Sequence, residues 1–352
     1  MDKNSRVSMK KTKKSRKKRT ILVTILTLFL IVGGYAGYLV YETVRAANDA
    51  YTEIDRGNKS KLRETEITMG KDPFSVLLMG IEDYSTGGTN GRTDTLMLAT
   101  FNPDTQTMKL LSIPRDTRVF FPDRNYYSKI NHAHAYGGKE MTIDRIEELL
   151  GVPVDYFATV NFDGFKNIID IVGGVTVDVP FSFSERSDTR PRYDIHFTEG
   201  EMTLGGEEAL AYARMRKKDP RGDFGRNDRQ KQIVEATINE LTSPQNLLRI
   251  DRIARELGQN IETNVRITDA IGLTSVYSNF NTSKIEQLSI KGTDDYINNI
   301  YYFIPDEIAL QEVQTELKVH LGILPESALT IDEEGTEGTP ETTIPPAQPG
   351  TP

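Results

Sequence analysis

The stretch "FSVLLMGIEDYSTGGTNGRTDTLMLATFNPDTQTMKLLSI", residues 74–113, decides the fold because turn-forming residues separate three apolar runs. The first run, residues 74–81, is continuously apolar, as is typical of a strand buried on both faces. Runs 94–101 and 107–113 flank "NPDTQ", which is rich in turn-forming residues, and so predict a β-hairpin. The stretch therefore predicts the centre of a β-sheet.

Strand and helix patterns alternate after this stretch. Apolar spacing predicts helices over 143–151, 163–174 and 226–242, and strands over 154–162 and 175–180. Asn227 or Asp228 is expected to cap the last helix. The predicted fold class is α/β, a three-layer α/β/α domain with a central mixed sheet.

The N-terminal region has the pattern of a membrane anchor. The first 20 residues contain ten Lys or Arg and one Asp, although the whole chain has a formal net charge of −8. Residues 20–41 carry no charged side chain, and a helix of this length spans roughly 30 Å, the thickness of the bilayer core. The basic tail is expected in the cytoplasm and the body outside. A cleaved signal peptide is the alternative, with "VRA" at 44–46 as a weak cleavage site.

These patterns divide the chain into five predicted parts. They are a cytoplasmic tail (1–19), a transmembrane helix (20–41), an extracellular, helical stalk (42–71), a catalytic domain (72–328) and an acidic, Thr/Pro-rich disordered tail (329–352). The chain has no Cys, which excludes disulfides, thiolate metal sites and a cysteine nucleophile.

The loop between the first two strands suggests a metal site. Its "GRT" at 91–93 is similar to the end of a P-loop, but Thr86 stands where the first glycine is required and the lysine is missing. Glu82 or Asp83 follows one strand and Asp94 begins the next, so these carboxylates are expected to converge. Mg²⁺ prefers one or two carboxylates together with water and phosphate oxygens. The alternative is that these residues are solvated loop acids.

Arginines are concentrated near the same predicted strand ends and in a later segment. They are Arg92, Arg115, Arg118, Arg214, Arg216, Arg221, Arg226 and Arg229. Alternation in an extended segment would place Arg214 and Arg216 on one face and Met215 on the other. Arg226 and Gln230 lie one turn apart where a helix is expected to begin, and helix N-termini attract phosphate. Arginines with carboxylates predict a metal-bound pyrophosphate or several phosphates, and a surface ion-pair network is the alternative.

Seven motifs carry a resemblance to the LytR-CpsA-Psr family of cell-wall proteins. They are "SVLLMGIED", "GRTDTLMLATFNP", "LLSIPRDTRV", "KINHAHAYGG", "VNFDGFKNIIDIVGGVTVDVP", "GEEALAYARMRKKD" and "GRNDRQKQIV". They follow the family's order over residues 74–241, after a basic tail and a single apolar span. One departure is that Glu82 occupies the position where the family usually has aspartate, with Asp83 beside it.

The resemblance implies a Mg²⁺-assisted phosphotransferase outside a Gram-positive membrane. Its donor would be a glycopolymer, such as wall teichoic acid or capsular polysaccharide, on undecaprenyl pyrophosphate, and its acceptor the 6-hydroxyl of N-acetylmuramic acid in peptidoglycan. The implied metal ligands are Asp94 with Asp83 or Glu82. Arg92 and Arg115 are implied to act in catalysis, with Asp223 as a catalytic or orienting carboxylate. The implied pyrophosphate-binding residues are Arg92, Arg115, Arg214, Arg216, Arg226 and Gln230.

Several alternatives stay open from the sequence. The protein could be a transcription attenuator, although the predicted topology puts its body across the membrane from DNA and no nucleic-acid partner is expected. It could also be a noncatalytic lipid or glycan binder, or a polyprenyl-pyrophosphate hydrolase. An apolar tunnel for the lipid could include Phe162, Phe165, Ile169 and Val172, although such spacing is more often plain core. His132 and His134 lack a third metal ligand, and Lys129 and Asn131 are expected at the rim of the site.

Overall fold

The structure, a computed structural model, describes residues 45, 51–54, 57, 59–82, 91–241, 243–247, 260–266 and 284–329. The predicted tail 1–19, the predicted transmembrane segment 20–41 and residues 330–352 lie outside this set. No helix within the described residues is long and apolar enough to cross a membrane.

A six-stranded mixed sheet forms the centre of the domain. Its strand order is β11 (Ile261–Thr263), β6 (Tyr156–Asn161), β1 (Phe74–Glu82), β2 (Arg92–Asn102), β3 (Thr107–Ser112) and β12 (Ile285–Ser289). The pairs β1–β2 and β2–β3 are antiparallel, which confirms the predicted hairpin, whereas β1–β6 and β3–β12 are parallel. The continuous apolar run of β1 fits its central position in the sheet.

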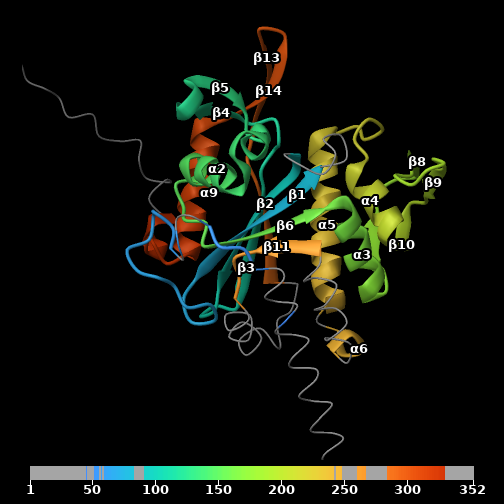
Figure 1. Cartoon of the computed structure of the whole chain (residues 1–352), viewed down its shortest axis with the longest axis horizontal. Coiled ribbons are helices and arrows are strands. Elements are labelled where there is room, and N and C mark those ends of the chain that lie inside the picture. Colours follow the sequence, from blue (N-terminus) through green and yellow to red (C-terminus); the bar gives the residue numbers. More distant parts are fainter. Residues whose placement is uncertain are drawn as a thin grey trace, which may run out of the picture.

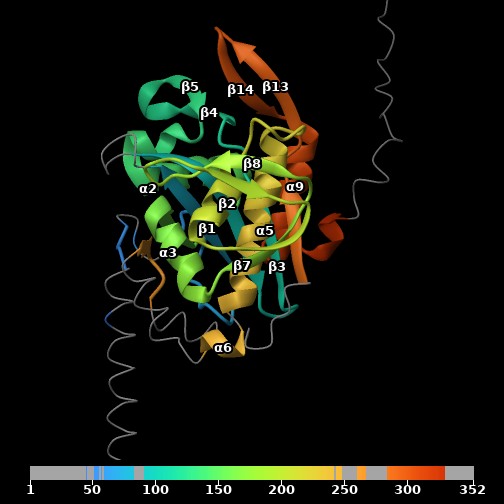
Figure 2. The same cartoon turned by 90° about the vertical axis from the view of Figure 1, so that its right-hand side faces the viewer.

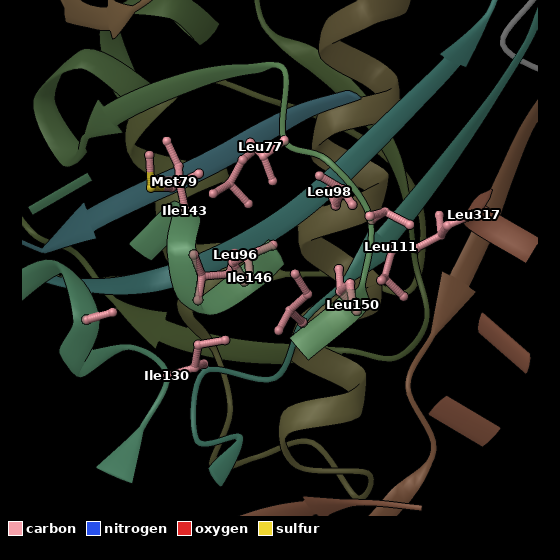
Figure 3. Close-up of a cluster of buried hydrophobic side chains, with 14 of the residues drawn as sticks. Leu77, Met79, Leu96, Leu98, Leu111, Ile130, Ile143, Ile146, Leu150 and Leu317 are labelled. Carbon is pink, nitrogen blue, oxygen red and sulfur yellow. The ribbon is translucent and has the colours of Figure 1, made fainter. Parts of the chain in front are cut away.

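Helices cover both faces of the sheet, as the three-layer prediction requires (Figure 1). On one face lie α2 (His132–Leu150) and α9 (Glu307–His320). Leu77, Leu98 and Leu111 from three neighbouring strands belong to one buried cluster with Ile146 of α2 and Leu317 of α9 (Figure 3). Alternation along each strand sends the intervening side chains to the opposite face.

The opposite face packs against α3 (Phe162–Val172) and α5 (Asp223–Leu241), and α4 (Gly206–Arg214) packs against these two helices. Met97 and Leu110 of the sheet form a smaller cluster with Val234 and Ile238 of α5. A separate core lies beneath α3 and α4, where the ribbon of β7 (Val175–Val179) and β10 (Gly200–Leu204) contributes buried valines. The predicted strand 175–180 therefore exists but belongs to a second sheet.

Short elements complete the described chain. Two hairpins stand near one end of the central sheet, β4 (Arg118–Phe121) with β5 (Tyr126–Lys129) and β13 (Gly292–Ile297) with β14 (Ile300–Pro305) (Figure 2). The other small elements are η2 (Pro122–Arg124), β8 (Phe183–Arg186), β9 (Asp194–Phe197), α6 (Pro244–Leu247) and η4 (Glu326–Leu329).

Two local predictions differ from the structure. Helix α5 begins at Asp223, so Asn227 and Asp228 lie inside the helix instead of capping it. Gly222 adopts a left-handed φ of 58° immediately before Asp223, which completes a turn and lets the helix start earlier. Within the predicted helical stalk, residue 45 is helical, but the described residues 51–54, 57 and 59–71 contain no helix. Ser60 is buried against the domain through a hydrogen bond to Glu147.

His320, at the end of α9, is buried against the sheet. Its Nδ1 lies 2.7 Å from the hydroxyl of Thr100, and its Nε2 lies 2.9 Å from that of Thr107. Burial, followed by the positive charge of Lys109, lowers the pKa of His320 to about 4. The imidazole is therefore neutral in the folded protein under mildly acidic conditions, in which an unfolded chain would protonate it.

This shift predicts a pH-dependent stability. Because the pKa of His320 is lower in the folded state, the neutral imidazole contributes to the free energy of unfolding in full above about pH 6.5. This contribution is lost as the pH falls toward about 4. His320→Gln should remove this proton-linked slope, which is at most about 1.4 kcal/mol per pH unit. Chemical denaturation of both proteins between pH 7 and pH 4 measures the difference, and parallel curves for the two proteins would contradict the assignment.

Candidate active site

A large cavity lies between the central sheet and helices α3, α4 and α5. Its volume is about 640 Å³. The part of the wall made by the sheet and the helices is mainly apolar and includes Leu78, Met97, Ala158, Val160, Phe162, Phe165, Ile168, Leu210, Ala213, Ile233 and Val234. The sequence predicts that four apolar residues of this region line a lipid tunnel or belong to the plain core, and the structure assigns two of them to each. Phe162 and Phe165 line the cavity, whereas Ile169 and Val172 are buried in the core beneath α3.

Cationic and polar side chains also line this cavity. They include Arg115, Arg214, Arg216, Lys217, Lys218, Arg226 and Gln230, and Asp94 is among them. The structure thus brings together five of the six residues that the sequence predicted to bind pyrophosphate. The sixth, Arg92, lies in a neighbouring chamber.

That neighbouring space, here called the polar chamber, has a volume of about 270 Å³. It is lined by Glu82, Arg92, Asp94, Arg115, Asp116, Lys129, Asn131 and His132. Asp94 and Arg115 line both spaces, so they form the boundary between the apolar cavity and the polar chamber.

Close strand pairing at Gly91 shapes the polar chamber. Glu82 at the end of β1 pairs with Arg92 at the start of β2, after an irregularity between Gly80 and Ile81. A Cβ atom at Gly91 would lie 2.2 Å from the carbonyl oxygen of Glu82, so only glycine permits this approach. Glu82 and Asp94 consequently line the same chamber, whereas Asp83 lies outside the described residues.

An ion pair joins the two boundary residues. Nη1 of Arg115 lies 2.6 Å from Oδ1 of Asp94. Burial alone would lower the pKa of Arg115, but the charges of Asp94 and Asp116 leave that pKa raised. Burial and the nearby charge of Arg115 lower the pKa of Arg226. Arg226 is therefore a buried cation that lies near a second positive charge. An anion placed between these two guanidinium groups would relieve that repulsion.

Asp223 holds two of the arginines. Its Oδ1 lies 2.5 Å from Nε of Arg216, and its Oδ2 lies 3.5 Å from Nη2 of Arg226. Of the two roles that the sequence suggested for this carboxylate, this geometry favours orientation of the arginines over proton transfer, because both oxygens already face cations.

Arg214 and Arg216 reach the cavity in a different way from the one predicted. Arg214 is the last residue of α4, and Met215 caps the helix, so the segment is not an extended strand. Met215 is nevertheless fully buried, while both arginines line the cavity. The prediction that Met215 points away from the two arginines is therefore correct. The predicted extended segment is wrong, because the helix continues through Ala213 and Arg214.

The other arginines of the predicted cluster have separate roles. Arg229 is fully buried, forms an ion pair with Asp219 and donates to the carbonyl oxygens of Tyr212 and Met215. It therefore fixes the segment that carries Arg214 and Arg216. Arg221 forms an ion pair with Asp228 at the surface.

Asp116 was not singled out from the sequence. It is buried, and its Oδ1 accepts a hydrogen bond from Nζ of Lys129 at 2.6 Å. Lys129 and Asn131, expected at the rim, both line the polar chamber. The position of Asp116 next to Arg115, in the turn after a strand, was the signal that could have identified it.

The residues present are compatible with a Mg²⁺ ion, although they do not form a complete site of their own. Glu82 and Asp94 present hard oxygen ligands to one chamber, and Mg²⁺ commonly takes only one or two carboxylates and fills its shell with water and phosphate. Within the described residues, no group of three or more acidic, His or Cys side chains gathers as a metal site. His132 and His134 contact Ser128 and the carbonyl of Gly91, respectively.

Comparisons with known proteins show which proteins this chain is similar to. The model of the LytR-CpsA-Psr family (LytR_cpsA_psr) matches residues 37–319. The chain is 50% identical over 318 residues to the polyisoprenyl-teichoic acid–peptidoglycan teichoic acid transferase TagV of Bacillus subtilis, covering 88% of this chain and 81% of that protein.

Solved structures of such relatives have a similar fold. The crystal structure of B. subtilis TagV matches with a TM-score of 0.66 and 52% identity, covering 72% of this chain and 99% of that one. The TagT protein (YwtF) of B. subtilis, solved with bound octaprenyl pyrophosphate lipid, matches with a TM-score of 0.61 and 34% identity, covering 77% of this chain and all of that one. The chain described here therefore belongs to the LytR-CpsA-Psr family.

Proposed function

We propose that this chain is a phosphotransferase acting on a lipid-linked glycopolymer. It would move a polymer of the wall teichoic acid or capsular polysaccharide type from undecaprenyl pyrophosphate to the 6-hydroxyl of N-acetylmuramic acid in peptidoglycan. The observation that carries this proposal is an apolar cavity of about 640 Å³ whose lining also gathers four arginines. Relatives named as teichoic acid transferases and the TagT complex with a polyprenyl pyrophosphate support it.

The cavity and its arginines match the two halves of such a donor. A polyprenyl tail is wholly apolar, and each methylene that it buries contributes about 0.8 kcal/mol. The pyrophosphate would then lie beside Arg115, Arg214, Arg216 and Arg226, whose guanidinium groups bind pairs of phosphate oxygens. A soluble nucleotide is unnecessary, because the pyrophosphate linkage already stores the energy of transfer.

The proposed reaction is a displacement at the phosphorus atom that carries the glycopolymer. The acceptor oxygen forms the new bond to phosphorus, and the bond to the bridging oxygen breaks. The electron pair leaves with polyprenyl phosphate, and the hydroxyl proton passes to solvent. Arginines held by Asp94 and Asp223 before the donor arrives would stabilise the charge that develops on these oxygens.

Mg²⁺ is part of the proposal. Asp94, together with either Asp83 or Glu82, would hold it. Of these residues, Glu82 and Asp94 line the polar chamber. When bound, the ion would neutralise charge on the phosphoryl oxygens. The carboxylates of this chain would fix its place at the boundary between the two spaces.

The proposal also includes the location of the enzyme. Residues 20–41 would anchor the chain in the cell membrane with the N-terminus in the cytoplasm, and the catalytic domain would lie outside. Such a single-pass anchor would keep the cavity near the membrane that carries the donor.

Loss of the Asp94 charge should abolish most of the activity. Asp94→Asn keeps the shape of the side chain but removes the partner of Arg115 and a proposed metal ligand, so the transfer rate should fall by about 100-fold or more. The measurement incubates the purified chain with Mg²⁺, a synthetic polyprenyl-pyrophosphate glycan and a peptidoglycan oligomer, and quantifies the linked product. Asp144→Asn, in an exposed pair with Lys61, is the matched control. Equal rates for wild type and Asp94→Asn would refute the proposed role, and release of polyprenyl phosphate without linked product would identify a hydrolase.

A large side chain in the cavity should block the lipid. Ala158→Phe would occupy space beside Val160 and Phe165, so the KM for a long polyprenyl donor should rise about tenfold or more, because apolar contacts with the tail are lost. A donor with a two-isoprene tail should be affected much less. Ala158→Ser, which barely changes the side-chain volume, is the control. Unchanged binding of the long donor to Ala158→Phe would show that the tail lies elsewhere.

A further inference from the structure

The β13–β14 hairpin is attached to the wall of the polar chamber. The backbone nitrogen of Phe303 in β14 donates to the carbonyl oxygen of Asp116 at 3.0 Å, and Phe303 forms a bridge with Thr117. The ring of Phe224, at the start of α5, packs edge-on against Phe303 with 6.2 Å between centroids. Beyond this root, the hairpin projects past the end of the central sheet (Figures 1 and 2).

Strand register shows which face of the hairpin continues the chamber. Tyr296 pairs directly with Tyr301, and Asp294 with Phe303, so these four side chains lie on one face. Nζ of Lys129, a residue of the polar chamber, lies 5.4 Å from the centroid of the Tyr301 ring. One face of the hairpin therefore leads from the chamber through Tyr301 to Tyr296.

The side chains on this face combine aromatic rings with hydrogen-bonding groups. Tyr296 is 71% exposed, and its ring lies 5.6 Å from that of Tyr301. The hydroxyl of Tyr301 donates to Oδ1 of Asp294 at 2.8 Å, and burial followed by that carboxylate raises the pKa of Tyr301. Rings with apolar faces beside carboxylate and hydroxyl groups suit a pyranose, which has an apolar face and a rim of hydroxyls.

Asn131 supplies an independent observation inside the chamber. Only 5% of this residue is exposed, and its Oδ1 has no hydrogen-bond partner among the described residues. Asn131 precedes α2, but its side chain does not cap the helix. A buried acceptor without a partner is destabilising, so a hydroxyl or amide donor from a ligand would recover that loss.

The position of the chamber relative to the cavity selects the ligand. Attacking and leaving oxygens lie roughly in line during phosphoryl transfer. In the proposed function the leaving polyprenyl phosphate lies in the apolar cavity, so the attacking hydroxyl must approach from the opposite side of the Asp94–Arg115 pair. That side is the polar chamber.

We propose that the polar chamber is the acceptor subsite and that the β13–β14 hairpin binds the acceptor's glycan strand, with Tyr296 and Tyr301 stacking on a sugar ring. This inference rests on the proposed function and identifies where its polysaccharide acceptor binds. The occupant is a strand of N-acetylated sugars with a free primary hydroxyl, which would enter the chamber while neighbouring rings lie on the hairpin.

A tryptophan reporter tests this binding directly. The chain contains no Trp, so Tyr296→Trp introduces a single indole at the proposed contact. Adding a peptidoglycan oligosaccharide of alternating N-acetylglucosamine and N-acetylmuramic acid to the purified full chain should change its emission saturably. Tyr193→Trp is the matched control, because Tyr193 is 54% exposed and lines neither space. No response at position 296, or equal responses at both positions, would overturn the proposal whether or not the chain is active.

Kinetics provide the second arm. Tyr296→Ala should raise the KM for the oligosaccharide acceptor about 3- to 10-fold, because one stacking ring is lost. Its kcat, its KM for the lipid-linked donor and its melting temperature should match those of wild type. Transfer with an unchanged acceptor KM would overturn the hairpin's role and leave the proposed function intact. Absence of linked product from wild type would refute the proposed function itself.

Discussion

The ion pair between Asp94 and Arg115 is the constraint on which the site depends. It joins the start of β2 to the turn after β3, and its two side chains divide an apolar cavity from a polar chamber. Both residues are partly buried, so breaking the pair would remove the shortest ion pair of Arg115 and leave its charge facing Asp116 at 3.6 Å. The same residues therefore maintain the local structure and present the charges that a phosphate would meet.

The arrangement of the other arginines follows from this pair. Arg226 is buried close to Arg115, and the two like charges repel each other. Asp94 and Asp223 neutralise part of the cluster, and Asp188 pairs with Arg214. The carboxylates thus hold the guanidinium groups in place and leave positive charge that an anion would neutralise. Because the arginines are fixed beforehand, little reorganisation would be required when charge develops on a phosphoryl group.

The sequence predicted the fold better than the details of the site. Continuous apolar runs and the turn at 102–106 were sufficient to identify β1, β2 and β3, because local patterns determine such elements. The start of α5 was missed because it depends on the left-handed turn at Gly222. Asp116 was missed because its burial and its pairing with Lys129 arise from the packing of separate elements. Arginine-rich motifs identified the cluster, but only the structure separates Arg229, which is structural, from those that line the cavity.

A glycan-binding surface would also explain how such a site selects transfer over hydrolysis. Water is present at a very high concentration and can attack the phosphorus without being bound. A sugar hydroxyl is present at a much lower concentration, so it can compete with water only if the protein binds it. Contacts remote from the reacting atoms can supply that advantage by holding the hydroxyl in line with the leaving group. The hairpin is rooted on the backbone of Asp116, directly beside Arg115, so a glycan strand bound along its aromatic face would be positioned relative to the same arginine that meets the phosphate. Donor and acceptor would then be aligned by the two sides of a single turn, residues 114–117.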